Sequence, residues 1–245
     1  MRSKAFLAFE QKMIYFNDDI ELVDVIRDGV LNEELTESGS KYVLRNINPT
    51  THTHIARRKN SPGSRKLLIN HLRATIYAAY VKDAYEEVTE YLRIILTKAA
   101  ENGFDAGRII GEHTFKIDAK TILEKGNWQS VTQLISESVF QALESEKSTL
   151  KLLEKISNKL ALNVNKTVIE EALPYLEVRH YLVHSDGLLS REFTSKYKFI
   201  KHEKGYIKLD YDFICKLKEK ICTLMEEYDQ RVIATNLLSR ECLQP

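Results

Sequence analysis

Apolar side chains recur every three or four positions along most of this 245-residue chain, which is the spacing of amphipathic helices. The first such run spans Lys4 to Ile26, and its apolar stripe consists of Phe6, Phe9, Met13, Phe16, Ile20 and Val23. The longest run begins at Ser64 and stops at Gly103, a residue type that often ends helices. We predict that its buried face consists of Leu67, Leu68, His71, Leu72, Ile76, Ala79, Tyr80, Asp83, Ala84 and Val88.

The stretch between these two helices lacks an apolar period. From about Asp28 to Pro62 it is polar and rich in turn-forming residues, so we predict a long loop, in which Lys41–Leu44 alone has the composition of a short strand. This change of pattern divides the chain into an N-terminal helix with a long polar loop, residues 1–63, and a helical bundle domain, residues 64–245.

Shorter periodic runs predict further helices at about residues 117–124, 130–143, 148–160 and 165–184. Pro174 should break or restart the last of these, because proline lacks the N–H that a helix interior needs. Residues 196–209 alternate around a central HEKG and predict a β-hairpin, and a last helix runs from Asp212 to about Leu238. The expected fold is all-α: an antiparallel helical bundle of four to five core helices, with a small β-hairpin before the last helix.

The composition fits this fold and narrows the function. Only 9 Gly and 4 Pro are present, too few for the many turns of a β-sandwich or barrel. The net charge of +1 creates no overall field for nucleic acid, so an RNA contact would need a local basic patch. The 3 cysteines lack CxxC spacing, which favours reduced thiols, and no stretch reaches the roughly 20 apolar residues of a membrane span. We therefore expect a soluble cytoplasmic protein that makes no membrane contact.

The segment Tyr175–Ser190, YLEVRHYLVHSDGLLS, places an arginine and two histidines at the end of an apolar helix. Four residues separate Arg179 from His184, but this spacing alone carries little information. The same or a slightly longer gap separates Arg108 and His113, Arg65 and His71, and Arg45 and His52. Only the pair Arg179 and His184 closes an apolar helix and runs directly into a helix stop at Gly187.

Three interpretations of this segment are open. Cations at the end of a helix can cap its last carbonyls, which is a structural role. His180 and His184 share a helical face and could bind a metal, although position 181 is not the Glu of the HExxH motif and no third ligand is evident. The third interpretation is an active site. Arg179 and His184 lie about 140° apart around a helix, so they converge only at a helix end or across a second subunit.

The motif resembles the signature of the HEPN superfamily of α-helical endoribonucleases, in the branch described as RiboL-PSP/MAE-like. That signature is an arginine, a polar residue and then a histidine at the end of a core helix, here Arg179, His180 and His184. The segment AAYVKDAYEEV resembles the first core helix of the family and offers Asp83 as its acidic residue. The resemblance covers about residues 64–230. It departs from the family at His180, where asparagine is usual, and at Asp186, where some members carry a tyrosine.

The resemblance implies a metal-independent endoribonuclease that needs no cofactor and cleaves RNA by transesterification through the 2′-OH. His184 would be the general base and Arg179 would stabilise the phosphorane, supported by His180 and Asp83. It also implies a homodimer with a composite site, a role as a toxin or antiviral defence effector, and room for an antitoxin or other regulatory partner. A non-catalytic RNA-binding or adaptor protein of the same fold is the alternative.

One basic cluster is a candidate for holding RNA phosphates through charge alone. It consists of Arg57, Arg58, Lys59, Arg65 and Lys66. The competing interpretation is an ordinary solvated surface.

Overall fold

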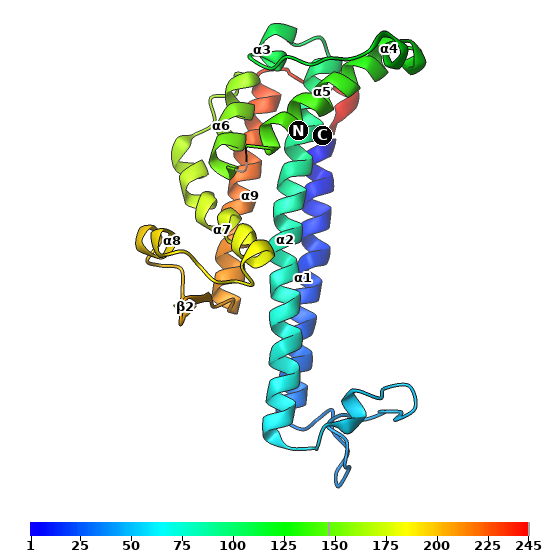
Figure 1. Cartoon of the computed structure of the whole chain (residues 1–245), viewed down its shortest axis with the longest axis vertical. Helices are drawn as coiled ribbons and strands as arrows, with labels where there is room; N and C mark the ends of the chain where they lie inside the picture. Colours follow the sequence, from blue (N-terminus) through cyan, green and yellow to red (C-terminus); the bar gives the residue numbers. More distant parts are fainter. Residues whose placement is uncertain (147, 245) are drawn as a thin grey trace. The chain divides into compact units, whose positions relative to one another are not determined.

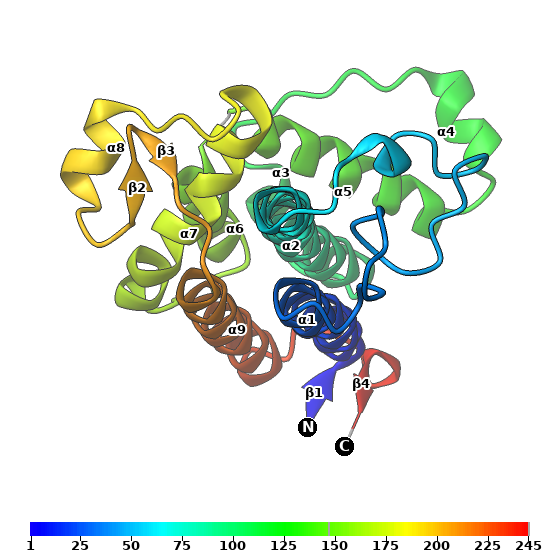
Figure 2. The ribbon, with the colours of Figure 1, turned by 90° about the horizontal axis from the view of Figure 1, so that it is seen from below.

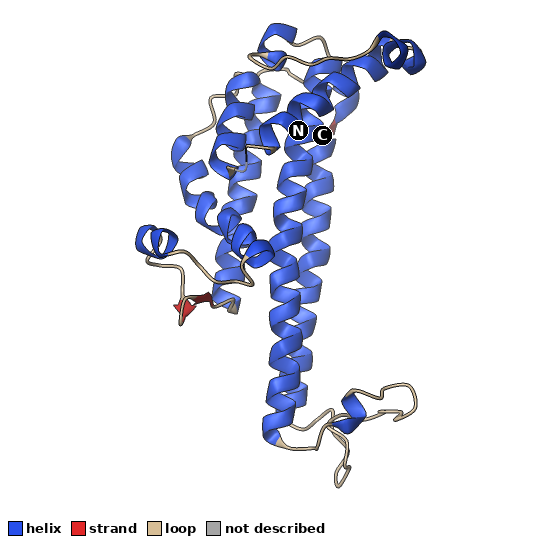
Figure 3. Cartoon of the chain, viewed as in Figure 1, coloured by secondary structure: helices blue, strands red, loops and turns tan. Residues whose placement is uncertain are grey.

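The computed structural model describes residues 1–146 and 148–244, and helices dominate this part of the chain (Figure 3). Its strands form two antiparallel pairs of two residues each, β1 with β4 and β2 with β3. The predicted all-α fold, with a small β-hairpin before the last helix, is therefore confirmed.

The α-helices within this described part are α1 (Lys4–Leu31), α2 (Pro62–Glu101), α3 (Ala106–Ile110), α4 (Ala119–Lys125), α5 (Trp128–Glu144), α6 (Thr149–Lys159), α7 (Lys166–His184), α8 (Arg191–Lys196) and α9 (Tyr211–Ala234). Two short 3₁₀ helices span Ile55–Arg57 and Arg240–Cys242. The strands are β1 (Arg2–Ser3), β2 (His202–Glu203), β3 (Tyr206–Ile207) and β4 (Leu243–Gln244).

The chain forms two compact units. The smaller unit is Met13–Tyr80, and the larger unit joins Met1–Lys12 to the chain from Val81 onward. Helices α1 and α2 each contribute to both units. The boundary expected at residues 63 and 64 therefore falls inside the smaller unit, where the first half of α2 packs with α1.

In the smaller unit, α1 and α2 run side by side and the long loop joins them (Figures 1 and 2). Asp24 of α1 anchors this pair: its Oδ1 lies 2.6 Å from Nε of Arg73, and its Oδ2 accepts a 2.8 Å hydrogen bond from the hydroxyl of Tyr77. Burial raises the pKa of Tyr77 to about 12, and the hydrogen bond to Asp24 acts in the same direction. A second polar link joins the helices where the Tyr80 hydroxyl donates to Asn17.

The first half of α2 buries a different stripe from the one predicted. Leu67 and Leu72 are exposed, at 57% and 42%, whereas Ile69 and Tyr77 are buried. The predicted stripe does not include Arg73, yet the ion pair of this residue with Asp24 lies beside Tyr77 and brings that side of the helix against α1. The predicted loop is present, and residues 41–44 form bends rather than a strand.

In the larger unit, α7 packs against α6 and α9, and α5 packs against α6. The two ends of the chain pair through Arg2 with Gln244 and Ser3 with Leu243 (Figure 2). The buried carboxylate of Asp229 in α9 also holds the N-terminus. It accepts hydrogen bonds from the backbone N–H of Ser3 at 3.1 Å, from the Ser3 hydroxyl, and from the Tyr91 hydroxyl at 3.0 Å.

Helix α7 continues through Pro174, so the predicted break is wrong. Proline removes one backbone donor from the helix, but the surrounding residues Ala172–Leu176 are buried and packing holds the helix together. The predicted hairpin is also shorter than expected. Its expected first residue, Lys196, is the last residue of α8, and its strands are limited to β2 and β3. The start of α8 is fixed by the Ser190 hydroxyl, which accepts a hydrogen bond from the N–H of Phe193.

Candidate active site

The end of α7 is set by the backbone of the residues that follow it. The carbonyl of Tyr181 accepts hydrogen bonds from the N–H of Ser185 at 3.0 Å and of Gly187 at 2.9 Å. Asp186 and Gly187 both have positive φ, at 50° and 83°. Glycine suits the second position, because a Cβ there would be strained and would lie 3.4 Å from Ile207. These backbone bonds satisfy the carbonyl of Tyr181 without a cationic cap.

His180 and His184 form an exposed pair of imidazoles on the last turn of this helix. Their ring centroids are 4.9 Å apart and the ring planes are inclined by 48°. His180 also meets the ring of Tyr181 edge-on, at 5.4 Å. The spacing of four residues thus gives a direct contact between the histidines, on a surface that solvent or a substrate can reach.

Arg179 is half-buried and points to a different neighbour. Its guanidinium carbon lies 5.0 Å from the centre of the Tyr85 ring on α2, which is a cation–π contact. Its Nε is buried and has no hydrogen-bond partner among the described residues. The Nε atoms of Arg27, Arg65 and Arg73 share that feature, so by itself it does not single out Arg179.

The structure therefore groups the predicted catalytic residues in two sets. The histidines contact each other, and Arg179 contacts α2 through Tyr85. Asp83 is half-buried on α2 and lies two residues before Tyr85, in the triplet Asp83-Ala84-Tyr85. Sequence analysis chose the acid of that triplet and missed the aromatic residue. The signal for Tyr85 was its place two positions after Asp83, in the segment that resembles the first core helix of the family.

The predicted RNA-binding cluster belongs to the smaller unit. Arg57, Arg58, Lys59 and Lys66 are exposed there, on the loop and the first turn of α2. Arg65 differs: it is 4% exposed, forms an ion pair with Glu33 and donates to the side chain of Asn60. Arg65 therefore holds the loop onto the helix and is not available to a phosphate.

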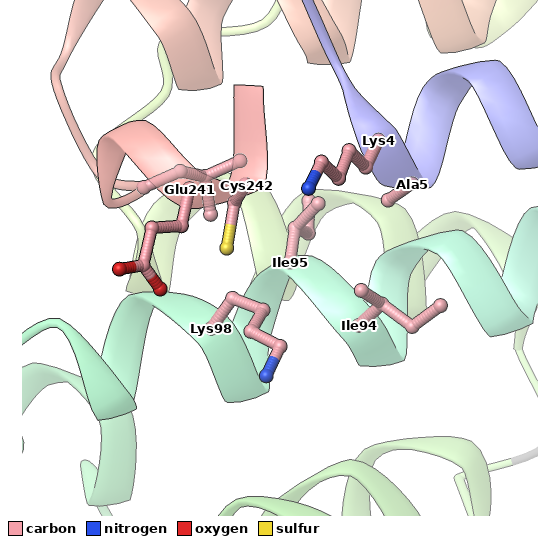
Figure 4. Close-up of a pocket in the computed structure, with 8 residues that line it drawn as sticks. Lys4, Ala5, Ile94, Ile95, Lys98, Glu241 and Cys242 are labelled. Atoms are coloured by element: carbon pink, nitrogen blue, oxygen red, sulfur yellow. The ribbon is translucent and has the colours of Figure 1, made fainter. Parts of the chain in front are cut away.

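Two cavities of the larger unit are lined by residues other than the predicted catalytic ones. One, of about 150 Å³, lies between the start of α1, α2 and the C-terminal segment (Figure 4). Its wall is mostly apolar, and the amine of Lys98 at its edge is bound to Glu101 at 2.7 Å. A more open groove of about 370 Å³ is lined by Arg93 and three glutamates, two of which pair with that arginine. Lys98 and Arg93 are therefore already paired with neighbouring glutamates.

The described residues offer no group of side chains that could bind a metal ion together with the two histidines. Across residues 1–146 and 148–244, no three His, Cys, Asp or Glu side chains gather in a way that could hold an ion. The same part of the chain has no helix with the length and apolar character that crossing a bilayer requires.

Comparisons of the chain with protein-family models, with curated proteins and with solved structures return no match.

Proposed function

We propose that the protein is a metal-independent endoribonuclease whose active site is the exposed end of α7. The observation that carries this proposal is the pair of contacting imidazoles, His180 and His184, which follow Arg179 by one and five residues. An aromatic ring holds that arginine in place. Imidazoles accept and donate protons near neutral pH, and a guanidinium binds phosphate oxygens through a planar fork. These are the groups that RNA cleavage without a metal requires.

The reaction is an internal transesterification. His184 takes the proton of the ribose 2′-OH, and the 2′-oxygen forms a bond to the adjacent phosphorus. The bond from phosphorus to the 5′-oxygen breaks, and His180 in its protonated form gives its proton to that leaving oxygen. The products are a 2′,3′-cyclic phosphate and a 5′-OH, and no water or metal enters the balance.

Arg179 stabilises the extra negative charge on the phosphorane between these two proton transfers. A preorganised donor of this kind contributes roughly 10²–10³-fold to a rate. Its contact with Tyr85 fixes the guanidinium before substrate arrives, so the arginine needs little rearrangement in the transition state. Asp83, on α2 with Tyr85, is a supporting residue in this proposal.

A composite dimer, implied by the HEPN resemblance, is part of the proposal, and the placement of these groups supports it. Arg179 and the histidines occupy different sides of one helix, and a twofold axis would bring the arginine of one protomer to the histidines of its partner. A toxin or antiviral defence role, with RNA as substrate and a regulatory partner or antitoxin, is part of the same proposal and rests on the HEPN resemblance alone.

The reaction type is tested by the ends of the products. In EDTA, wild-type protein should leave a 2′,3′-cyclic phosphate on an RNA that contains one scissile ribonucleotide, and a 2′-deoxy substitution there should abolish cleavage. A linear 3′-OH product, or cleavage of the deoxy substrate, would contradict transesterification.

The composite site is tested by mixing two inactive variants. Arg179→Ala and His184→Ala proteins, unfolded together and refolded, should recover about a quarter of wild-type activity, since half of the dimers are mixed and each keeps one intact site. Refolding each variant alone is the control. No recovery in a mixture shown to contain mixed dimers would contradict a site shared between protomers.

A further inference from the structure

A basic and aromatic surface lies directly beside the candidate active site, on α8 and the β2–β3 hairpin. Residues 191–208 contain six Lys or Arg and two Glu, in a chain whose overall net charge is only +1. All six cations are exposed: Arg191, Lys196, Lys198, Lys201, Lys204 and Lys208. This is the local basic patch that a contact with nucleic acid needs in a nearly neutral protein.

Few of these cations are neutralised within the protein. Lys201 is committed to Asp210 and Asp212, at 3.1 and 3.2 Å. In contrast, Lys198, Lys204 and Lys208 form no ion pair with any residue of the described chain. The surface therefore presents at least three uncompensated positive charges over one short segment.

Large apolar side chains are exposed between these charges. Phe199 is 59% and Tyr206 is 51% exposed, and Leu188 is 45% exposed. The centre of the Phe199 ring lies 6.2 Å from the ring centre of Tyr175 and 6.2 Å from that of Tyr197. Tyr206 lies directly across a β-bridge from Leu188, so both side chains project from the same face.

The hairpin is fixed to the end of α7. The N–H of Ile207 donates to the carbonyl of Gly187, and the N–H of Leu189 donates to the carbonyl of Gly205, both at 2.9 Å. The Tyr181 and Ser190 hydroxyls are also hydrogen bonded, at 2.9 Å. Leu188 follows His184 by only four residues. A ligand bound on this surface is therefore held next to the imidazole pair.

We propose that this surface, formed by Phe199, Tyr206 and the lysines 198, 204 and 208, is the binding platform for single-stranded RNA. It deepens the ribonuclease function proposed above and rests on it. Exposed aromatic rings stack on unpaired bases, and the lysines between them neutralise the phosphates. Bases in a duplex are already stacked on each other, so the platform selects single strands, loops and ends. The small, interrupted apolar area is typical of stacking on bases rather than of a protein interface.

The test separates binding from cleavage. A labelled 12-nucleotide RNA with 2′-O-methyl riboses cannot undergo transesterification, and its affinity is measured by fluorescence anisotropy in EDTA. Phe199→Ala with Tyr206→Ala should weaken binding at least about thirtyfold. Lys198→Ala with Lys204→Ala should lower the slope of log affinity against log salt by about two. A duplex of the same sequence should bind more weakly and should not respond to the aromatic substitutions.

Tyr15→Ala is the matched control. Tyr15 is exposed to the same extent as Phe199, at 58%, but lies beside Asp18 and Asp19 on α1. This variant should bind the RNA as the wild type does, and unchanged circular dichroism and thermal unfolding establish that every variant is folded. Equal affinity of the platform variants and wild type, an equal loss in Tyr15→Ala, or no binding by wild type would overturn the platform. So would a dependence on Phe199 and Tyr206 for anionic lipid vesicles but not for RNA.

The outcomes also distinguish this proposal from the catalytic one. If RNA binding depends on the platform but wild type cleaves no RNA with free 2′-OH groups, the platform stands and the ribonuclease function fails. If wild type cleaves RNA and the platform variants have unchanged kcat/KM and affinity, the ribonuclease function stands and the platform fails.

Discussion

The guanidinium carbon of Arg179 lies 5.0 Å from the centre of the Tyr85 ring, which joins the end of α7 to the middle of α2. This contact holds the arginine of the proposed active site against an aromatic ring. It also gives Tyr85 a role that the ring of either tyrosine or phenylalanine can fill.

Replacing Tyr85 separates this positioning role from a general structural one. Tyr85→Ala should lower kcat for RNA cleavage about tenfold with little change in KM, since a cation–π contact of this kind is worth about 0.5–2 kcal/mol. Tyr85→Phe keeps the ring and should stay within about twofold of wild type. Steady-state kinetics of the two variants decide the matter. Equal losses in both, or a loss in KM alone, would show that the ring does not position the arginine.

Gly187 offers a test of the turn that follows His184. Gly187→Ala forces a side chain into a φ of 83° and should cost about 1–2 kcal/mol of unfolding free energy. Gly103→Ala is a close control, because Gly103 has a φ of 82° and open space where a Cβ would lie. Both variants should lose similar stability in urea, but only Gly187→Ala should lower RNA cleavage and platform binding, because Gly187 carries the bond to Ile207.

Equal RNA cleavage by Gly187→Ala and Gly103→Ala, at equal stability, would contradict this prediction. It would mean that the turn does not align the hairpin with the imidazole pair.

Asp229 should contribute far more to stability than a surface carboxylate. Asp229→Ala removes the acceptor for Ser3 and Tyr91 and leaves buried donors unsatisfied, which should cost about 3 kcal/mol. Asp212→Ala, at an exposed site that pairs with two lysines, should cost less than about 1 kcal/mol. Urea unfolding measures both. A cost for Asp229→Ala no greater than that of the control would show that the N-terminal strand is not held by this carboxylate.

The raised pKa of Tyr77 predicts a loss of stability at alkaline pH. Its pKa is about 12 in the folded protein and near 10 when unfolded, so between these values the unfolded chain releases the proton more readily. The free energy of unfolding should therefore fall as pH rises from about 10 to 12. Tyr77→Phe should reduce this slope, and Tyr15→Phe, at an exposed tyrosine, should leave it unchanged. An identical alkaline slope in wild type and Tyr77→Phe would contradict the assignment.

The helices could be predicted from the sequence because their apolar periods are long and their stops are clear, as at Gly103 and Gly187. The buried stripe of α2 could not be predicted. The apolar spacing around Leu67 indicates one side of the helix, whereas Arg73 and Tyr77 lie on the side that packs against α1. The ion pair to Asp24, 49 positions away in the chain, decides between them. Local patterns contain no information about such a partner.

The same limit applies to the candidate site. The contact between His180 and His184 follows from a spacing of four on one helix. The partner of Arg179 lies 94 positions earlier, and the hairpin reaches Gly187 through backbone bonds that side-chain patterns do not reveal. Pro174 misled the prediction for a related reason, because tertiary packing outweighs the local cost of a missing donor.

Cleavage of single-stranded RNA in EDTA by wild type, His184→Ala and His113→Ala tests the central claim most directly. His113 has the same spacing from an arginine as His184 but lies outside the proposed site. The account predicts that wild type and His113→Ala cleave equally and that His184→Ala, folded and binding RNA normally, loses at least about 10²-fold. Equal cleavage by wild type and His184→Ala, or none by folded wild type offered varied RNAs, would contradict it.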